Sequence, residues 1–240
     1  MTGRGECWRP GPLRLVLWNV ADPARPRLLR RLAAAPLVPD NPGPLPFGVS
    51  QADLVFSPDG HILASVSGRD QVTLWNVTRP DRATRIATLA GPRDYFAALA
   101  FSPRGSLLAG VTYHGSVLVF RVAGPVLVTT RPGILASARF PGGGRAPASP
   151  CGCGADAAYA AAFAPDGHAL TVVIARPETS PSTAARDTVF TWQVAGPGTL
   201  SDLITDFRDV SDAQPALASG GRIVADGSAI GGEIHLWTLP

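Results

Sequence analysis

A unit first seen between Leu54 and Val77 limits the chain to folds built from short strands. Its sequence is LVFSPDGHILASVSGRDQVTLWNV. Pro58 fixes the backbone for the first central position of a type I turn, Asp59 suits the second, and Gly60 accepts the positive φ that lets the next strand leave. A second turn leads to a run ending in TLWNV, which is rich in β-branched and aromatic residues. The unit therefore predicts three antiparallel strands in about two dozen residues.

The unit recurs along the chain, which is the signature of a repeat architecture. The aromatic residue near the end of its last strand occurs five times, at Trp18, Trp75, Phe120, Trp192 and Trp237. Successive members of this series lie 57, 45, 72 and 45 residues apart. The turn recurs as FSPDG, FSPRG and FAPDG, beginning at Phe56, Phe101 and Phe163. We interpret these eight aromatic residues as structural repeat positions, and we expect the three phenylalanines to end inner strands.

Composition favours strands over helices and argues against several partners. Of the 240 residues, 45% are hydrophobic, 26 are Gly and 24 are Pro, a balance typical of an all-β domain with many turns. The formal net charge is only +3 and no dense basic run accompanies it, so nucleic-acid binding is not expected. No stretch approaches the roughly 20 apolar residues that span a bilayer. We therefore predict no membrane partner and a cytoplasmic protein.

These residues resemble the WD-repeat β-propeller family. The resemblance is carried by FSPDG, by the following ILASVSG and by the strand ending in TLWNV, and it is strongest over residues 54–122. The stretch DPARPRLL also looks like the linkers of actinobacterial members. The resemblance implies blades of four antiparallel strands arranged around an axis, without helices.

On this pattern the chain forms one incomplete or open propeller of about four to five blades. We expect a partial blade over 13–33, blades over about 52–90, 94–131 and 157–206, a partial blade over 213–240, and long loops over 34–51, 132–156 and 175–186. Either residues 13–20 pair outside residues 233–239 to close a four-bladed ring, or the chain is an open arc. We favour the arc, whose unpaired edges predict self-association.

The sequence departs from the family at the residues that lock each blade. Family members often carry a buried hydrogen-bond relay of His, Ser or Thr, Asp and Trp. Pro92 and Gly154 stand where the relay His is expected, and the turn Asp is replaced by Arg69, His114 and Arg186. We therefore expect the relay to be missing and the blades to depend on packing.

Residues able to carry chemistry are few. His61 and His168 follow the Asp-Gly turns and are expected to face solvent. Cys151 and Cys153 could supply two thiolates to zinc, but a structural site needs four ligands. We predict no metal, no cofactor and no catalytic residue. Asp94 stands where the family commonly has Asp, which favours a structural role.

Two classes of function remain open. The first is a non-catalytic protein–protein interaction or scaffold module, as the resemblance to propellers in larger bacterial signalling proteins implies. The second is a propeller enzyme of the hydrolase or lactonase type, which would need an axial metal held by acidic and His side chains. The scarcity of such ligands in the sequence favours the module.

The predicted partner site lies on one rim of the propeller. Because strands alternate in direction, the three long loops should emerge on the same side as the turns that carry Arg69, His114 and Arg186, with Arg93 and Tyr95 adjoining them. Arg and Tyr often anchor protein interfaces. These five residues are our candidate partner-binding set, for an acidic peptide, a partner domain or the remainder of a larger protein. Solvated turn residues are the equally weighted alternative.

Overall fold

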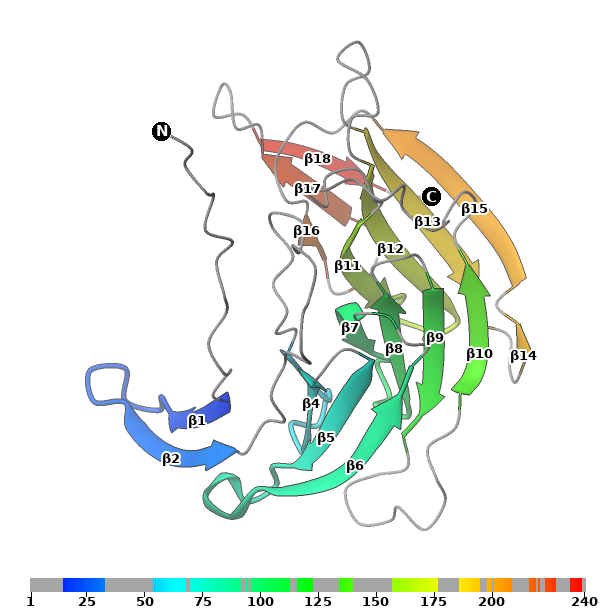
Figure 1. Ribbon diagram of the computed structural model, residues 1–240. Helices are drawn as coiled ribbons and strands as arrows, with labels where there is room; N and C mark the ends of the chain where they lie inside the picture. The colour runs from blue at the N-terminus through cyan, green and yellow to red at the C-terminus, as the bar shows by residue number, and fades with distance from the viewer. Residues whose placement is uncertain are drawn as a thin grey trace, which may run out of the picture.

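The computed structural model consists of five β-sheets that lie along an open arc (Figure 1). The residues that it describes are 15–32, 54–67, 70–91, 94, 96–112, 116–122, 134–139, 157–176, 186–194, 198–199, 201–208, 216–218, 220, 223–227 and 234–238. The all-β architecture expected from the sequence is confirmed. One turn of 3-10 helix, η1 (Pro80–Arg82), is the exception to a strand-only chain within these residues.

Each sheet is formed from a continuous part of the chain, with one addition. The first sheet holds β1 (Leu15–Asn19) and β2 (Arg27–Leu32). The second holds β3 (Leu54–Phe56), β4 (Ile62–Ser67), β5 (Gln71–Asn76) and β6 (Thr84–Ala90). The third holds β7 (Phe96–Phe101), β8 (Leu107–Thr112), β9 (Ser116–Arg121) and β10 (Ile134–Arg139), and β14 (Gly198–Thr199) joins its outer edge.

The last two sheets complete the arc. The fourth holds β11 (Ala157–Phe163), β12 (Ala169–Arg176), β13 (Arg186–Gln193) and β15 (Ser201–Arg208). The fifth holds β16 (Ala216–Leu217), β17 (Ile223–Gly227) and β18 (Ile234–Thr238). The strands β3, β7, β11 and β16 contact one another in that order, so they are the inner strands of their sheets.

The repeated turns have the backbone that their sequences predict. Gly60, Gly105 and Gly167 adopt φ of 72°, 70° and 78°, in the left-handed region that glycine enters without a steric cost. In the first turn, the amide of Gly60 donates to the carbonyl of Ser57 over 2.8 Å. The turns place a phenylalanine at the end of β3, β7 and β11.

A cross-strand triplet recurs in the three central sheets. Each inner-strand phenylalanine lies opposite a leucine, which lies opposite the aromatic residue of the third strand. The triplets are Phe56–Leu63–Trp75, Phe101–Leu108–Phe120 and Phe163–Leu170–Trp192. Residues directly opposite in antiparallel strands share a face of the sheet. Each triplet therefore belongs to one face.

That face packs against the preceding sheet. The second sheet contributes Ile62, Ala64, Val66, Val72, Leu74 and Leu89 to a core with Phe96, Leu99, Phe101, Leu108, Leu118, Phe120 and Val122 of the third. The third contributes Ala98, Ala100, Ala109, Val111, Val117 and Val119 to a core with Phe163, Leu170, Val172, Phe190, Trp192 and Val194 of the fourth. At both junctions the later sheet supplies the aromatic side chains and the earlier sheet supplies only aliphatic ones.

The arc is open among the described residues, in agreement with the open arc expected from the sequence. There β1 pairs only with β2, and β18 pairs only with β17. The first sheet packs Leu17 and Leu32 against Leu63 and Trp75 of the second. The first sheet has only two described strands, so it covers less of the second sheet than a four-stranded blade would.

Two of the expected boundaries are wrong. The predicted loop 132–156 contains β10, which pairs with β9 and extends the blade predicted to end at 131. The run ILASAR begins like the ILASVS of β4, but it does not follow an FSPDG-type turn, so it does not stand at the expected place in the repeat. The predicted loop 175–186 overlaps the ends of β12 and β13.

The strand β14 pairs in parallel with β10, whereas the expected blades contain only antiparallel pairs. The predicted loop 34–51 lies outside the described residues.

In the second sheet the Trp–Ser part of the relay remains, so the expectation that this blade depends on packing alone is wrong. The indole nitrogen of Trp75 donates to the hydroxyl of Ser65 over 2.9 Å, and both residues are buried. The hydroxyl oxygens of Ser67 and Thr73 lie 2.6 Å apart. Ser65 thus satisfies the buried indole even though Arg69 stands at the turn Asp position.

Candidate partner-binding surface

Most of the predicted rim set lies outside the described residues. This is so for Arg69, Arg93, Tyr95 and His114. Arg186 is the first residue of β13, and its side chain is not among those described. Two described residues close to this set in the sequence contact each other: the amide of Gly91 donates to the carbonyl of Asp70 over 2.7 Å. The rim set stays a prediction.

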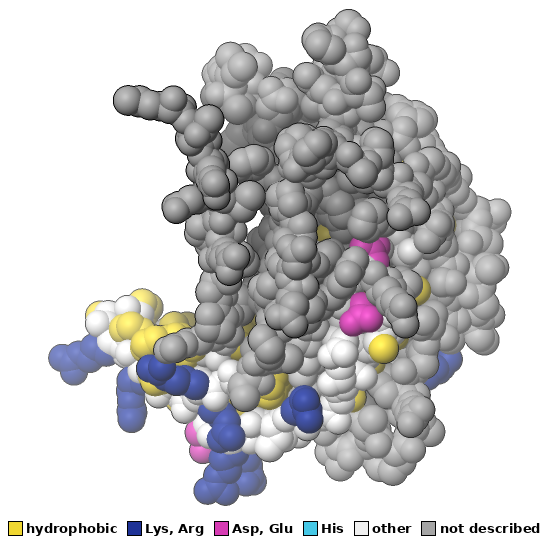
Figure 2. Space-filling model, viewed as in Figure 1, with side chains coloured by type: hydrophobic (Ala, Val, Ile, Leu, Met, Phe, Trp, Pro, Cys, Tyr) yellow, Lys and Arg dark blue, Asp and Glu magenta, His cyan; other side chains and the backbone are white. Residues whose placement is uncertain are grey.

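The structure assembles a different basic surface, which we call the arginine surface. It comprises seven exposed arginines from the β1–β2 hairpin and from the η1–β6 segment: Arg25, Arg27, Arg30, Arg31, Arg79, Arg82 and Arg85. Figure 2 shows Arg side chains gathered at the lower left of the molecule, around these elements. The residues 15–32 and 76–90 contain two acidic residues, Asp22 and Asp81. The surface thus has an excess of five positive charges, whereas the whole chain has a net charge of +3.

A hydrogen bond joins the two halves of the arginine surface. The Nη1 atom of Arg30 donates to the backbone carbonyl of Asp81 over 3.0 Å. Arg30 and Asp81 are 51 residues apart in the sequence, so this contact connects two adjacent sheets. Asp81 also lies 3.8 Å from the Nε atom of Arg82, at a well-exposed position where such pairs contribute little stability. Among the described residues, no acidic side chain pairs with Arg27, Arg79 or Arg85.

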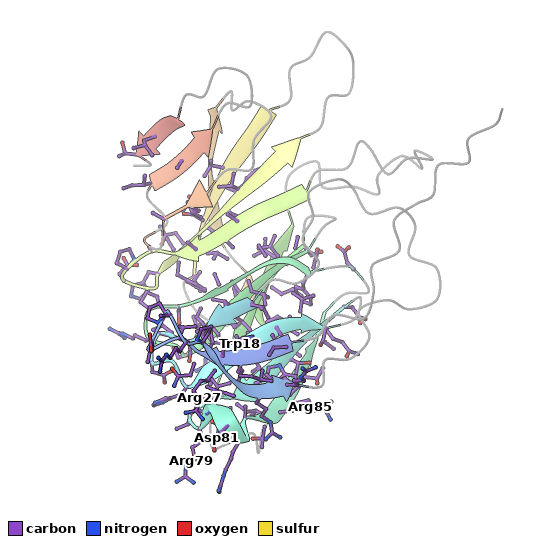
Figure 3. All side chains as sticks on the ribbon, turned by 90° about the vertical axis from the view of Figure 1, so that its left-hand side faces the viewer. Trp18, Arg27, Arg79, Asp81 and Arg85 are labelled. Atoms are coloured by element: carbon purple, nitrogen blue, oxygen red, sulfur yellow. The ribbon has the colours of Figure 1, made fainter. Side chains whose placement is uncertain are left out.

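Local sequence explains why these arginines point outward. In β2, whose sequence is RLLRRL, Leu32 is buried and Leu29 packs against the core shared with the second sheet, which leaves the arginines at the surface. Pro80 occupies the first turn of η1, where its fixed φ suits a helix start. Arg85 lies opposite Trp75 across β5 and β6. Figure 3 shows Arg27, Arg79, Asp81 and Arg85 near one another at the outer side of the arc, with Trp18 beside them on β1.

Sequence reasoning missed this surface because its parts are far apart in the chain. Neither segment is a dense basic run, and the whole-chain charge hides the local excess. The signal that could have indicated it is the set of arginines in β2 combined with the PDR that follows β5. Adjacent sheets in a propeller bring such segments together.

The aromatic repeat positions divide into a buried group and an exposed pair. Trp75, Phe101, Phe120, Phe163 and Trp192 are 1–9% exposed. In contrast, Trp18 is 53% exposed and Phe56 is 55% exposed. Trp237 lies in β18, and its side chain is not among those described.

The described polar residues of the turns have structural contacts. The carboxylate of Asp59 accepts from the hydroxyl of Ser57 over 2.5 Å and from the amide of His61 over 2.9 Å. These two hydrogen bonds hold the pKa of Asp59 below its ordinary value. His61 and His168 are exposed, and Asp94 is buried. Cys151 and Cys153 lie outside the described residues.

The described residues contain neither a cluster of metal-ligand side chains nor a membrane-spanning helix. No three side chains of the His, Cys, Asp and Glu types come together there as metal ligands would. No helix in this part of the chain is long and apolar enough to cross a membrane.

Comparison with known proteins identifies a fold but no family. No family model matches the sequence, and no curated protein matches it. The β-propeller domain of Cps50 (Swd1) from Myceliophteria thermophila is 10% identical, and the match covers 94% of this chain and 64% of that one, with a TM-score of 0.55. A protein from Lactobacillus plantarum is 16% identical over 95% of this chain and 61% of its own, with a TM-score of 0.63.

A third similar structure is the WD40 domain of Toxoplasma gondii coronin. It is 14% identical over 78% of this chain and 45% of its own length, with a TM-score of 0.45. The chain spans less than two thirds of the length of each of these structures. The radial sheets and the match to a solved propeller domain show that the fold is an all-β propeller, open between its first and last sheets.

Proposed function

We propose that the chain is a non-catalytic interaction module that binds an acidic segment of a protein partner through the arginine surface. The observation that carries this proposal is the excess of five positive charges on two adjacent segments, joined by the Arg30–Asp81 hydrogen bond. Arginine presents a planar group that binds carboxylates through two parallel hydrogen bonds. A group of exposed arginines, of which Arg27, Arg79 and Arg85 pair with no described acidic side chain, therefore suits a partner that offers several carboxylates.

A protein partner fits this surface better than a purely electrostatic ligand does. Exposed apolar side chains adjoin the arginines, including Trp18, Val20 and Leu28. Tryptophan and arginine are the side chains that most often dominate protein interfaces. An acidic segment with an apolar side chain would contact both kinds of group. The resemblance to propellers of bacterial signalling proteins supports a place in a larger regulatory protein or assembly.

The test is a binding titration with a defined acidic probe. A fluorescein-labelled glutamate peptide with one central leucine is added to the full chain, and its fluorescence anisotropy is measured. We expect binding that weakens as salt rises, because exposed charges are screened. The double variant Arg27→Glu, Arg79→Glu should bind at least about tenfold more weakly, because it places like charges against the probe.

A matched control uses arginines elsewhere on the molecule. Arg104 and Arg121 are exposed residues of the third sheet, and their double change to Glu alters the total charge without touching the arginine surface. This control should bind the peptide as the unaltered chain does. Equal losses of peptide affinity in both variants would show that net charge alone causes the effect. Tighter binding of a labelled DNA duplex than of the peptide, or no binding of the peptide at all, would contradict the proposal.

A further inference from the structure

Two of the connections between a third and a fourth strand reach back to the sheet before them. The β5–β6 connection contains η1, which contacts β2 of the first sheet. The β13–β15 connection contains β14, which pairs in parallel with β10 of the third sheet, as Figure 1 shows. Each connection therefore links its own sheet to the preceding one.

The residues that reach back occupy the same place in the repeat. Asp81, whose carbonyl accepts a hydrogen bond from β2, lies six residues after Trp75. Gly198, which pairs with β10, lies six residues after Trp192. Trp75 and Trp192 are equivalent repeat positions, so the chain reaches the preceding sheet after the same number of residues in both cases.

The residues that receive these contacts are equivalent as well. Arg30 of β2 lies opposite Leu17, which precedes an aromatic repeat position. Ala136 of β10 lies opposite Val119, which also precedes one, and Ala136 is the residue that pairs with Gly198. In both strands the register shifts next to this residue. The two contacts are therefore versions of one repeated inter-sheet contact.

The inter-sheet contact at β2 uses a side chain, whereas the one at β10 uses backbone pairing. In the β5–β6 connection, Pro80 has no amide hydrogen to donate to a strand ladder, and it favours the start of η1. The Nη1 atom of Arg30 donates instead to the carbonyl of Asp81 over 3.0 Å. Among the described residues, Arg30 thus supplies the link that β14 supplies by pairing in the third sheet.

The tip of the β5–β6 connection, residues 78–82, is exposed. Val77 and Ala83 on either side of it are buried in the core shared by the first two sheets. The hydrogen bond from the amide of Arg82 to the carbonyl of Arg79 lies within the tip, so it cannot fix the tip against another sheet. The side-chain hydrogen bond from β2 does join the tip to the first sheet.

We propose that Arg30 is a positioning residue of the arginine surface, because its hydrogen bond holds η1 beside β2. Arg79 and Arg82 of η1 and its flank then lie at a fixed spacing from Arg27 of the hairpin (Figure 3). One acidic segment can contact both groups without first ordering them, which lowers the cost of binding. This consequence for binding rests on the proposed function, whereas the position of η1 does not.

Hydrogen exchange of the amides in residues 78–83 of the full chain, followed by mass spectrometry, tests whether Arg30 holds η1. Arg30→Met removes the donor, and Arg31→Met removes the same charge from the adjacent residue, which faces the other side of the sheet. We expect exchange to be about two- to tenfold faster in Arg30→Met, the range for the loss of one hydrogen bond, and unchanged in Arg31→Met. Arg30→Lys keeps a donor and a charge, so it should restore most of the protection. Equal exchange in Arg30→Met and Arg31→Met would overturn the proposal.

Binding of the labelled glutamate peptide tests the consequence for the arginine surface. Arg31→Met should weaken binding by at most about fivefold, the range for one exposed charge. Arg30→Met should weaken it by at least about tenfold, because it also leaves η1 unfixed. Asp81→Asn keeps the backbone carbonyl and removes a negative charge, so it should keep the exchange protection and bind the peptide at least as tightly as the unaltered chain.

The two measurements separate this inference from the proposed function. Equal losses of affinity in Arg30→Met and Arg31→Met would contradict a positioning role in binding. An unaltered chain that does not bind the peptide would refute the proposed function, and the exchange rates would still decide whether Arg30 positions η1.

Discussion

The Phe96 ring occupies the space in which a side chain on Gly110 would stand. A Cβ atom built on Gly110 would lie 2.5 Å from Cε1 and 2.9 Å from Cδ1 of Phe96. Both residues belong to adjacent strands of the third sheet, and Phe96 is 1% exposed in the core shared with the second sheet. The ring centroids of Phe96 and Phe120 are 6.4 Å apart, so the ring is held from a second side.

We predict that Gly110→Ala destabilises the fold, because the buried ring has little room to move. Overpacking of this kind costs about 1–3 kcal/mol of unfolding free energy, which urea denaturation would measure. Gly220→Ala is the matched control, since its Cβ would have only an ordinary contact of 3.6 Å with Pro165. Adding Phe96→Leu to Gly110→Ala should recover part of the loss. A Gly110→Ala protein as stable as the control would contradict the packing described.

The buried Trp75–Ser65 hydrogen bond gives a second prediction. Ser65→Ala should destabilise the protein by about 1–3 kcal/mol, because it leaves the indole N–H buried without its acceptor. Trp75→Phe removes the donor as well as part of the ring. In the double variant the cost of Ser65→Ala should shrink, and a double-mutant cycle on urea midpoints measures this coupling. Strict additivity would show that the hydrogen bond contributes nothing.

The fold could be predicted wherever the sequence carries a local signal. Pro58 and Gly60 specify a turn by their own backbone preferences, and the spacing from Phe56 to Trp75 matches that from Phe101 to Phe120. The strand β10 shares ILAS with β4, but it lacks the FSPDG-type turn and the repeat spacing that would place it, and it pairs with β9 and β14. Pairing that depends on neighbours cannot be found in a local pattern.

The candidate surface could not be predicted for a related reason. Arg30 and Asp81 meet only because the first and second sheets are neighbours, and no motif in either segment indicates the other. The exposure of Phe56 is equally hidden, since its turn is nearly identical to those of the buried Phe101 and Phe163. Repeat position predicts which face a side chain occupies, whereas the neighbouring sheet decides whether that face is covered.

A third prediction concerns acid stability. The hydrogen bonds from Ser57 and His61 lower the pKa of Asp59 in the folded protein. A carboxyl group with a depressed folded pKa stabilises the fold above its unfolded pKa, and that contribution is lost as pH falls through the folded pKa. We expect the unfolding free energy of the unaltered chain to fall toward that of Asp59→Asn as the solution is acidified. Ser57→Ala should lessen the pH dependence, since it removes the main cause of the shift. Parallel pH profiles for the unaltered chain and Asp59→Asn would contradict this account.

The last prediction compares the three repeated turns, which differ in their polar groups. The first turn has both Ser57, whose hydroxyl accepts from the amide of Ile62, and Asp59, which accepts from Ser57 and His61. The second keeps only the serine contact, from Leu107 to Ser102 over 3.0 Å, and has Arg104 in place of the aspartate. The third keeps only the aspartate contact, from His168 to Asp166 over 2.8 Å.

Arg104→Asp should therefore stabilise the protein, because the second turn already has the serine and the backbone that the first turn uses. Gly105 has φ of 70° against 72° for Gly60, so a carboxylate at position 104 would reach the hydroxyl of Ser102 without rearrangement. A net gain of about 0.5–1.5 kcal/mol is expected for a new hydrogen bond of this kind. Arg104→Ala is the control, since it removes the arginine without adding an acceptor, and urea denaturation above the acid range compares the two. If Arg104→Ala stabilises the protein as much as Arg104→Asp does, the gain comes from losing the arginine, and the turn hydrogen bonds are not its cause.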